Sequence, residues 1–184
     1  MEITGRETVY EGKYLRMVKK TAVTVQKQEC IWETVERTNI FDNMVVVVVA
    51  LTGENEFVME RQWRAAVESY VFQFPAGLMD IENESSEEAA RRELLEETGY
   101  AAGKLVPIIT APTNPVLSPT IARYYFAPDV EYIGGENREP GEDMDIITVP
   151  RDSIGKFLLS PPEGTVRDLA VAGIIKIMEE KGLI

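Results

Sequence analysis

The 184-residue sequence contains no histidine, one cysteine and no long apolar run. The lack of histidine removes the commonest general base and metal ligand, together with every serine or cysteine mechanism that depends on imidazole. Cys30 is the single cysteine, so it has no partner for an internal disulfide and no neighbouring thiol for a zinc site. Any chemistry must therefore use carboxylates, and we expect them to act with a metal ion.

Basic segments and targeting segments are also missing. No stretch approaches the ~18 to 20 apolar residues of a membrane span, and the acidic start MEITGRE lacks the regions of a signal peptide. The formal net charge of -12 opposes the electrostatic binding of long nucleic acid. With 45% hydrophobic residues the composition suits one globular domain. We expect a cytoplasmic protein that binds neither a membrane nor long nucleic acid.

The first half of the chain is rich in residues that favour strands. Residues 14–26 and 31–38 are joined by a short polar turn and are predicted to form a hairpin. The β-branched run MVVVVVAL at 44–51 predicts a buried central strand. Further strands are expected at 57–64, 70–77, 104–110, 121–133 and 145–149.

Two helices are predicted between and after these strands. Ser85 and Glu88 have the spacing of a capping box, and Gly99 stands where a left-handed residue ends a helix. A closing helix is expected over 165–182, with Gly182 as its stop. Two helices against a mixed sheet predict an α/β sandwich, because the chain lacks the regular βαβ alternation of a doubly wound fold.

The first predicted helix carries the sequence RRELLEETGY. At about 100° per residue, Glu93, Glu96 and Glu97 lie on one face of this helix. Like charges at this spacing destabilise a helix by a few tenths of a kcal/mol per pair, roughly, so a positive group should offset them. An ordinary solvated surface, on which Arg91 and Arg92 balance the glutamates, is the alternative to a functional site.

The residues around this face favour a functional site. The stretch GLMDIENESSEEAARRELLEETGY, which begins at Gly77, resembles the Nudix box: a glycine, a glutamate, then Arg-Glu-apolar-x-Glu-Glu-x-Gly-apolar. From Glu84 onwards the spacing fits completely. Between Gly77 and Glu84, however, the chain has one residue more than the pattern, which puts Asn83 in the place of the glutamate. We expect a bulge in this loop, so that Glu84 keeps the role.

The resemblance implies a fold and a metal site. The fold would be a Nudix-type α/β/α sandwich with a mixed β-sheet over residues 43–184, preceded by an antiparallel N-terminal β region over 1–42 that contributes to dimerisation and substrate binding. The ion would be Mg²⁺, with Mn²⁺ also possible, because hard oxygen ligands suit these ions. The residues that the resemblance assigns to the ion are the Ala76 carbonyl, Glu93, Glu97 and, as an assisting carboxylate, Glu96. Arg92 would orient these carboxylates, so Arg92 and Glu96 are also candidate catalytic residues.

Motifs outside the box look like the branch that contains ADP-ribose and ADP-sugar pyrophosphatases. They are EGKYLRM, WETVERT, RQWR and FQFPAGLMD, in that order. The match places Tyr14 and Trp32 around the adenine, where base stacking is tolerant of sequence. It places Arg37 and Arg64 at a phosphate or the terminal sugar, which guanidinium groups suit. Core packing of the aromatic rings and surface ion pairs of the arginines remain the alternatives.

The same match points to an acidic loop, EPGEDMDI, as the source of a general base. Without histidine, a carboxylate must accept the proton of the attacking water. Glu142 is the first candidate, and Glu139 and Asp143 are reserves. A merely solvated loop is the alternative, and Met144 replaces an acid that some relatives carry, which leaves the number of metal ions open.

The resemblance therefore predicts Mg²⁺-dependent hydrolysis of the pyrophosphate bond in ADP-ribose or a related nucleoside diphosphate sugar, by a homodimer. The products would be a nucleoside monophosphate and a sugar phosphate. Relatives often have Pro-Gly in the loop at 111–120, where this chain has Pro115 and Val116, so the preferred sugar is open. Dinucleoside polyphosphates or nucleoside triphosphates are alternative substrates, and a non-catalytic nucleotide-sugar sensor is the alternative of another class.

Overall fold

The computed structural model describes residues 1–138 and 141–184, which form two compact units. The N-terminal unit comprises Met1–Val45, Leu78–Glu84 and Thr110–Ala122. The core unit comprises Val46–Gly77, Ser85–Ile109 and Arg123–Ile184.

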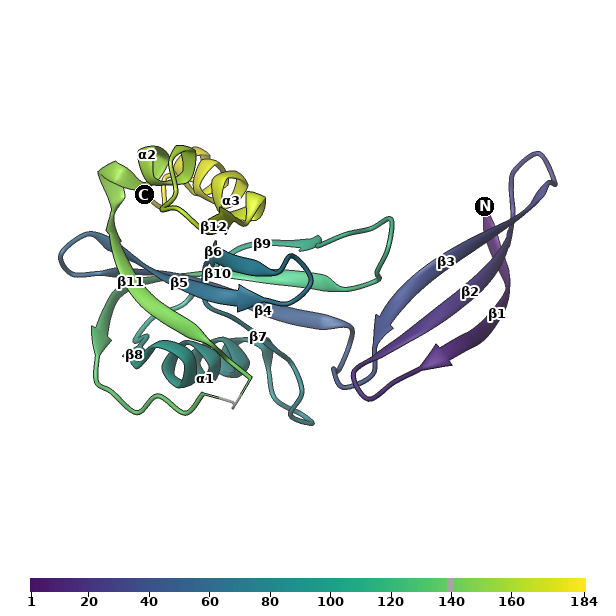
Figure 1. Cartoon of the computed structure of the whole chain (residues 1–184), viewed down its shortest axis with the longest axis horizontal. Helices are drawn as coiled ribbons and strands as arrows, with labels where there is room; N and C mark the ends of the chain where they lie inside the picture. The colour runs from purple at the N-terminus through teal and green to yellow at the C-terminus, as the bar shows by residue number, and fades with distance from the viewer. Residues whose placement is uncertain (139–140) are drawn as a thin grey trace. The chain divides into compact units, whose positions relative to one another are not determined.

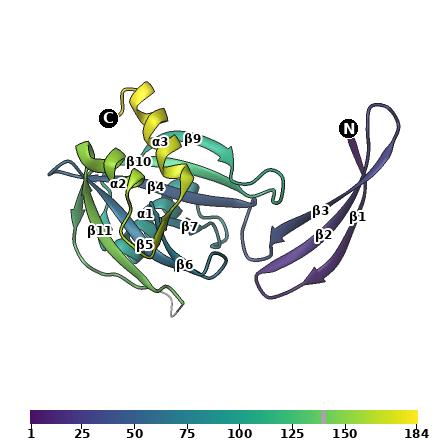
Figure 2. The same ribbon diagram turned by 45° about the horizontal axis from the view of Figure 1, so that its top comes forward.

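The N-terminal unit is built on a three-stranded antiparallel sheet in the order β1-β2-β3 (Figures 1 and 2). The strands are β1 (Glu2–Glu11), β2 (Leu15–Val23) and β3 (Glu29–Arg37). The predicted hairpin is confirmed, with Leu15 opposite Arg37 and Val23 opposite Glu29. Strand β1 was not predicted, because its largely polar sequence gives no clear alternation and its residues are almost all exposed. Its pairing with β2 is what makes it a strand.

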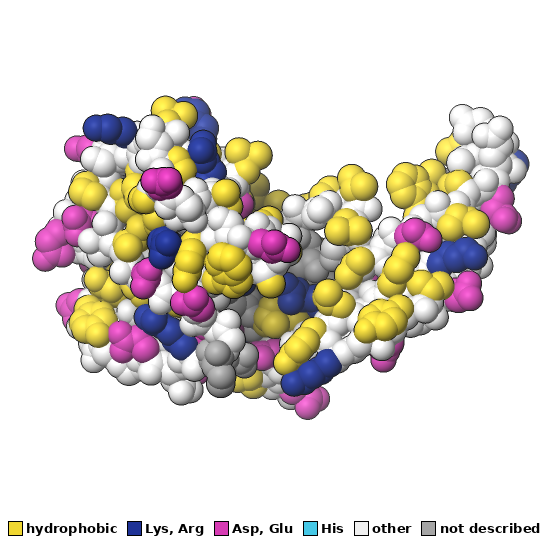
Figure 3. Space-filling view, viewed as in Figure 1, with side chains coloured by type: hydrophobic (Ala, Val, Ile, Leu, Met, Phe, Trp, Pro, Cys, Tyr) yellow, Lys and Arg dark blue, Asp and Glu magenta, His cyan; other side chains and the backbone are white. Residues whose placement is uncertain are grey.

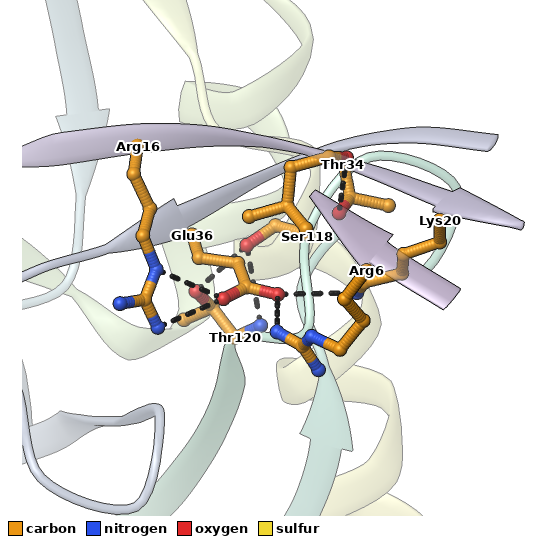
Figure 4. A network of polar contacts seen from close by, with 8 residues as sticks. Arg6, Arg16, Lys20, Thr34, Glu36, Ser118 and Thr120 are labelled. Carbon is orange, nitrogen blue, oxygen red and sulfur yellow. Dashed lines mark hydrogen bonds and ion pairs between the residues drawn. The ribbon is translucent and has the colours of Figure 1, made fainter. Parts of the chain in front are cut away.

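One buried ion-pair network ties the three strands together. Glu36 in β3 is only 4% exposed, and its carboxylate accepts from Arg6 of β1 at 2.7 Å and from Arg16 and Lys20 of β2 at 3.0 and 3.1 Å (Figure 4). Burial by itself raises the pKa of Glu36, but the hydrogen bonds from Lys20 and Arg16 and the charge of Arg6 outweigh it, so the pKa lies below its usual value. Both carboxylate oxygens are thus engaged.

The larger sheet has nine strands and mixed pairing. Its main path runs β12-β6-β5-β4-β10-β8; β11 pairs with β5, β7 with β4 and β9 with β10. Strand β12 pairs with β6 in parallel, whereas β5 and β6 are antiparallel. The bounds of the strands are β4 Met44–Thr52, β5 Glu56–Arg64, β6 Ser69–Gln73, β7 Ala76–Leu78, β8 Tyr100–Ala101, β9 Val106–Pro112, β10 Ile121–Tyr132, β11 Met144–Pro150 and β12 Thr165–Arg167.

Helices cover both faces of this sheet. The helix α1 (Ser86–Thr98) lies on one face, and α2 (Ile154–Leu159) and α3 (Leu169–Glu180) lie on the other (Figure 1). The short 3-10 helix η1 (Arg151–Ser153) precedes α2. The predicted α/β/α sandwich with a mixed sheet is confirmed. A cluster of buried side chains from β4, β5 and α3, including Val49, Phe57, Met59, Ile174 and Met178, forms its core.

The predicted bounds of the closing helix are wrong at its start. Residues 165–167 form strand β12, and Asp168 caps the helix by accepting from Ala170 N at 2.9 Å, so α3 begins at Leu169. Helix α2 was not predicted. Within the described ranges, no helix is long and apolar enough to cross a membrane.

The predicted ends of α1 are confirmed. The Ser85 side chain accepts from Glu88 N, and the Glu88 side chain accepts from Ser85 N at 2.9 Å, which completes the capping box. Gly99 ends the helix with a φ of 74°. Ala90 and Leu94 are fully buried, so they fix which way the helix faces.

Candidate active site

An arginine neutralises the acidic face of α1, as the like charges required. Arg92 Nη1 lies 2.8 Å from Glu93 Oε1 and 3.2 Å from Glu96 Oε2. Glu96 is the more exposed of these two glutamates. Arg92 thereby contacts both carboxylates, and its orienting role stays a prediction.

The third glutamate, Glu97, points into the protein. It is 4% exposed, and its Oε2 accepts from the backbone N of Ala76 at 3.1 Å. The segment before α1 and the acidic face of α1 therefore meet at this contact. The structure brings together two residues, Ala76 and Glu97, that the sequence pattern assigned to one metal site.

Gly77 lies so close to the same face that no side chain fits there. A Cβ atom built on Gly77 would overlap the carboxylate of Glu93. The φ angle of Gly77 is not in the left-handed region, so the glycine is needed for the close approach of a side chain and not for an unusual backbone. Glycine at this position lets the Glu93 carboxylate lie against the backbone.

A fourth carboxylate, Glu60 of β5, was missed by the sequence reasoning. Glu60 is fully buried, and its Oε2 accepts from Gln73 Nε2 at 3.1 Å. The carboxyl groups of Glu60 and Glu97 are close enough to share a hydrogen bond if one carries a proton. No donor from the described part of the chain reaches Glu60 Oε1. The signal in the sequence was a glutamate directly after the apolar residues FVM of a predicted strand.

Hydrogen bonds connect this carboxylate to Arg64, one of the predicted substrate residues. Arg64 donates to Gln73 Oε1 through Nε at 3.1 Å and through Nη2 at 2.9 Å. The other side of the Gln73 amide donates to Glu60, and also to Gln62 Oε1 at 3.2 Å. Arg64, Gln73, Glu60 and Glu97 therefore follow one another in a continuous polar chain.

The electrostatics of this cluster favour a bound cation. Burial raises the pKa of Glu97, and the negative charges of Glu60, Glu93 and Glu142 raise it further. Burial also raises the pKa of Glu60, and the charge of Glu142 adds to that effect. Carboxylates removed from water in this way are stabilised when they are paired or coordinate a metal.

The donor set fits Mg²⁺ or Mn²⁺. All of these groups are hard oxygen donors, and no donor from the described residues reaches the buried Glu60 Oε1. Among the residues that the structure describes, no three acidic or cysteine side chains already form a closed cage for an ion. Mg²⁺ does not require such a cage, because it commonly binds through one or two carboxylates, several waters and substrate phosphates.

Glu142 lies near the cluster. Glu142 is half-buried, and its charge acts on both Glu60 and Glu97. Asp143, a reserve candidate, accepts from the Tyr70 hydroxyl at 2.8 Å, and its backbone oxygen accepts from Trp63 N. The other reserve, Glu139, lies outside the described residues.

Arg138 anchors the loop to the helix and was not predicted. Its Nε donates to the backbone oxygen of Glu97 at 2.8 Å, and its Nη1 donates to that of Met144 at 3.2 Å. Nearby, Asn137 N donates to Glu96 O. These bonds satisfy carbonyl groups at the end of α1 and hold residues 137 and 138 against it.

Three of the predicted substrate residues belong to the N-terminal unit. Tyr14 lies in the turn before β2, Trp32 lies in β3, and Arg37 ends β3. The two aromatic side chains are 55% and 46% exposed, so neither ring is packed in a core. The side chain of Lys13 lies over the Tyr14 ring, with Nζ at 4.7 Å from its centroid. The part of Tyr14, Trp32 and Arg37 in substrate binding stays a prediction.

The loop with the extra residue also belongs to the N-terminal unit. Asn83 has a φ of 65°, and Glu84 N donates to Ile81 O at 3.3 Å, which makes a tight turn. Asparagine tolerates the left-handed region better than most residues. Such a turn is one way to absorb an additional residue before Glu84, whose role stays a prediction.

Comparisons with known proteins identify the family. The NUDIX domain profile matches residues 42–167, more than half of the chain. An ADP-ribose pyrophosphatase of Bacillus subtilis is 37% identical over 98 residues, which are 53% of this chain and 52% of that protein. The chain thus spans about half the length of that relative. An ADP-sugar pyrophosphatase of Mus musculus is 30% identical over 170 residues, which are 83% of this chain and 74% of that protein.

A solved structure supports the fold. The crystal structure of an ADP compounds hydrolase matches with a TM-score of 0.82 over 98% of this chain and 94% of that one. The sequence identity is 22%, so this likeness bears on the fold alone. The domain match over more than half of the sequence shows that the chain belongs to the NUDIX domain family.

Proposed function

We propose that this chain hydrolyses the pyrophosphate bond of ADP-ribose or a related nucleoside diphosphate sugar, with Mg²⁺ or Mn²⁺ as cofactor. The observation that carries the proposal is the cluster of glutamates on α1, with Glu97 buried against Ala76 and Glu93 packed against Gly77. Relatives named as ADP-ribose and ADP-sugar pyrophosphatases support the substrate class.

In the proposed site, Glu93 and Glu97 hold the ion, the Ala76 carbonyl contributes, and Glu96 assists. When bound, the ion would neutralise the pyrophosphate and lower the pKa of an attacking water. Arg92 keeps two of these carboxylates in place through its contacts of 2.8 and 3.2 Å. Without the positive charge of Arg92 the like charges on the helix face would repel one another.

Glu142 is proposed as the base that accepts the proton of the water. Two observations support this proposal: Glu142 is half-buried, and its negative charge raises the pKa of the buried Glu97. Arg138 fixes the neighbouring backbone to the end of α1 through the Glu97 and Met144 carbonyls. A base needs a fixed position relative to the reacting atoms, and this anchoring would supply it.

Four residues are proposed to recognise the substrate. Tyr14 and Trp32 would stack on the adenine, because their rings are exposed and available to a planar ligand. Arg37 and Arg64 would bind phosphate or the terminal sugar. The hydrogen bonds from Arg64 to Gln73 hold that guanidinium group in place.

A homodimer through the N-terminal sheet is part of the proposal. The face of β1–β3 seen in Figure 3 carries many apolar side chains, and large apolar patches on a protein surface commonly mark interfaces. Exposed apolar residues of this sheet include Ile3, Val9, Tyr10, Leu15 and Ile31. Light scattering or analytical ultracentrifugation would measure the mass in solution.

A panel of nucleotides tests the function. The purified chain is incubated with ADP-ribose, ADP-glucose, UDP-sugars, diadenosine polyphosphates and dGTP, in Mg²⁺, in Mn²⁺ and in chelator. We expect metal-dependent release of a nucleoside monophosphate from the ADP-sugars. Preference for a triphosphate or a dinucleoside polyphosphate would refute the substrate class, and binding without any turnover would indicate a sensor.

The site assignment is tested with a matched pair of variants on one helix. Glu97→Gln removes the charge of the buried glutamate, and we expect activity to fall more than about 100-fold, beyond the loss typical of groups that only support a metal ligand. Glu87→Gln changes an exposed glutamate that pairs with Arg91 and should leave activity unchanged. Normal hydrolysis by the Glu97 variant would contradict the metal assignment.

A further inference from the structure

Glu60 is a buried carboxylate, and the described side chains around it do not balance its negative charge. It follows three buried residues of β5, Phe57, Val58 and Met59, and is itself fully shielded from water. One oxygen, Oε2, accepts from the Gln73 amide at 3.1 Å, and no donor from the described residues reaches the other, Oε1. An ionised carboxylate buried with an unpaired oxygen is unfavourable, so a missing partner is expected.

A buried glutamate outside the candidate site shows what a purely structural carboxylate looks like here. Glu36 in the N-terminal unit has cations on both oxygens, from Arg6, Arg16 and Lys20. Glu60 instead has one amide on one oxygen, and its nearest guanidinium, that of Arg64, donates to Gln73. The positive partner that Glu36 finds within the protein is absent from the described contacts of Glu60.

The neighbours of the Glu60 carboxyl group indicate where that partner would lie. The group is within hydrogen-bonding reach of Glu97, and Glu97 is held in turn by Ala76 N. Two carboxylates from different elements, β5 and α1, therefore converge on one point next to the backbone that precedes α1. A divalent cation satisfies converging carboxylates, since it offsets their repulsion and takes oxygen ligands from both.

We propose that Glu60 is a further carboxylate of the metal centre and binds the divalent cation jointly with Glu97. This rests on the proposed function, in which Glu93 and Glu97 hold the ion. Gln73 is then a positioning residue, because it holds Oε2 and leaves Oε1 for the cation. Arg64 fixes Gln73 from the other side and so connects the substrate-binding arginine to the metal site.

The test measures Mn²⁺ binding directly, by the electron paramagnetic resonance signal of free Mn²⁺ during titration of the metal-free, full-length protein. Two variants are compared with the wild type: Glu60→Gln, which keeps the shape, and Glu60→Leu, which removes all polarity. Both should weaken Mn²⁺ binding by more than about 100-fold, because even groups that only support a metal ligand contribute about 10- to 100-fold. Urea unfolding in chelator should show no loss of stability, because each change removes an unpaired buried charge.

Glu36→Gln is the matched control, since it changes a buried glutamate that lies outside the proposed metal site. It should lower stability in urea and leave the Mn²⁺ affinity of the folded protein unchanged. Wild-type Mn²⁺ affinity in either Glu60 variant would overturn the proposal, as would a loss of stability in chelator with unchanged affinity. A wild-type protein that binds Mn²⁺ but hydrolyses no nucleotide sugar would refute the proposed function and leave the role of Glu60 in place.

Discussion

Substitution of Gly77 by alanine should damage the metal site while leaving the fold almost intact. The added Cβ would overlap the Glu93 carboxylate, whose carbon and two oxygens are its nearest neighbours. These atoms form the end of a flexible side chain, so Glu93 can swing aside without displacing the backbone. The movement would break the contact of Glu93 with Arg92 at 2.8 Å.

The two consequences differ greatly in size. Loss of a partly exposed ion pair costs about 1 kcal/mol or less of stability, and alanine recovers part of this because glycine is the more flexible residue when unfolded. A misplacement of about 1 Å in a reacting group, by contrast, can cost roughly 100-fold in rate. We therefore expect kcat/KM for ADP-ribose to fall about 100-fold at nearly unchanged stability.

Two measurements on two variants separate these effects. Hydrolysis of ADP-ribose in Mg²⁺ reports the site, and urea unfolding reports the fold. The control is Gly173→Ala in α3, where an added Cβ meets no atom within 4 Å. It should raise stability by about 0.5 to 1 kcal/mol and leave activity unchanged. Wild-type activity in Gly77→Ala would show that the Glu93 carboxylate is not needed where the structure has it.

Three further predictions concern the base, the metal and the buried ion pair. Glu142→Gln should lower kcat about 100- to 10,000-fold, the usual contribution of general-base catalysis, and an unchanged kcat would remove it from that role. Chelation by EDTA should abolish hydrolysis and added Mg²⁺ or Mn²⁺ should restore it, whereas turnover in excess EDTA would exclude a metal-dependent reaction. Glu36→Gln should cost about 1 to 3 kcal/mol in urea unfolding at pH 7, because it leaves three cations without their shared acceptor. The pKa of Glu36 in the folded protein is lowered, so its stabilising effect is complete above the ordinary value of 4.5 and is lost as the pH falls through the folded value. The Glu36→Gln variant should therefore lose less stability than the wild type when the pH falls below 4.5. Parallel pH profiles of the two proteins would contradict this reasoning.

Much of the first helix was predictable because its determinants are local. Ser85, Glu88 and Gly99 act within one turn of the ends of α1, and all three act as predicted. The shared face of Glu93 and Glu97 follows from helical geometry alone. The central strand β4 was predicted from its β-branched run for the same reason.

Elements that depend on distant partners were not predictable in this way. Strand β12 is only three residues long and exists because it pairs in parallel with β6, which is far away in the sequence. Strand β1 likewise depends on its register with β2. Asp168, a good N-cap residue, was the local signal that could have moved the start of the last helix to Leu169.

The sequence by itself determined the family resemblance and the acidic face, since both rest on the spacing of residues within a few helical turns. Only the tertiary structure decided that Glu97 is buried on Ala76 N and that Glu60 faces it from another element. Spacing along the chain says nothing about the burial of a carboxylate or the completeness of its hydrogen bonds. Those depend on how β5, β7 and α1 pack. Because of this packing Glu60 is buried, and no donor from the described residues reaches its Oε1, which is the observation that favours a bound cation.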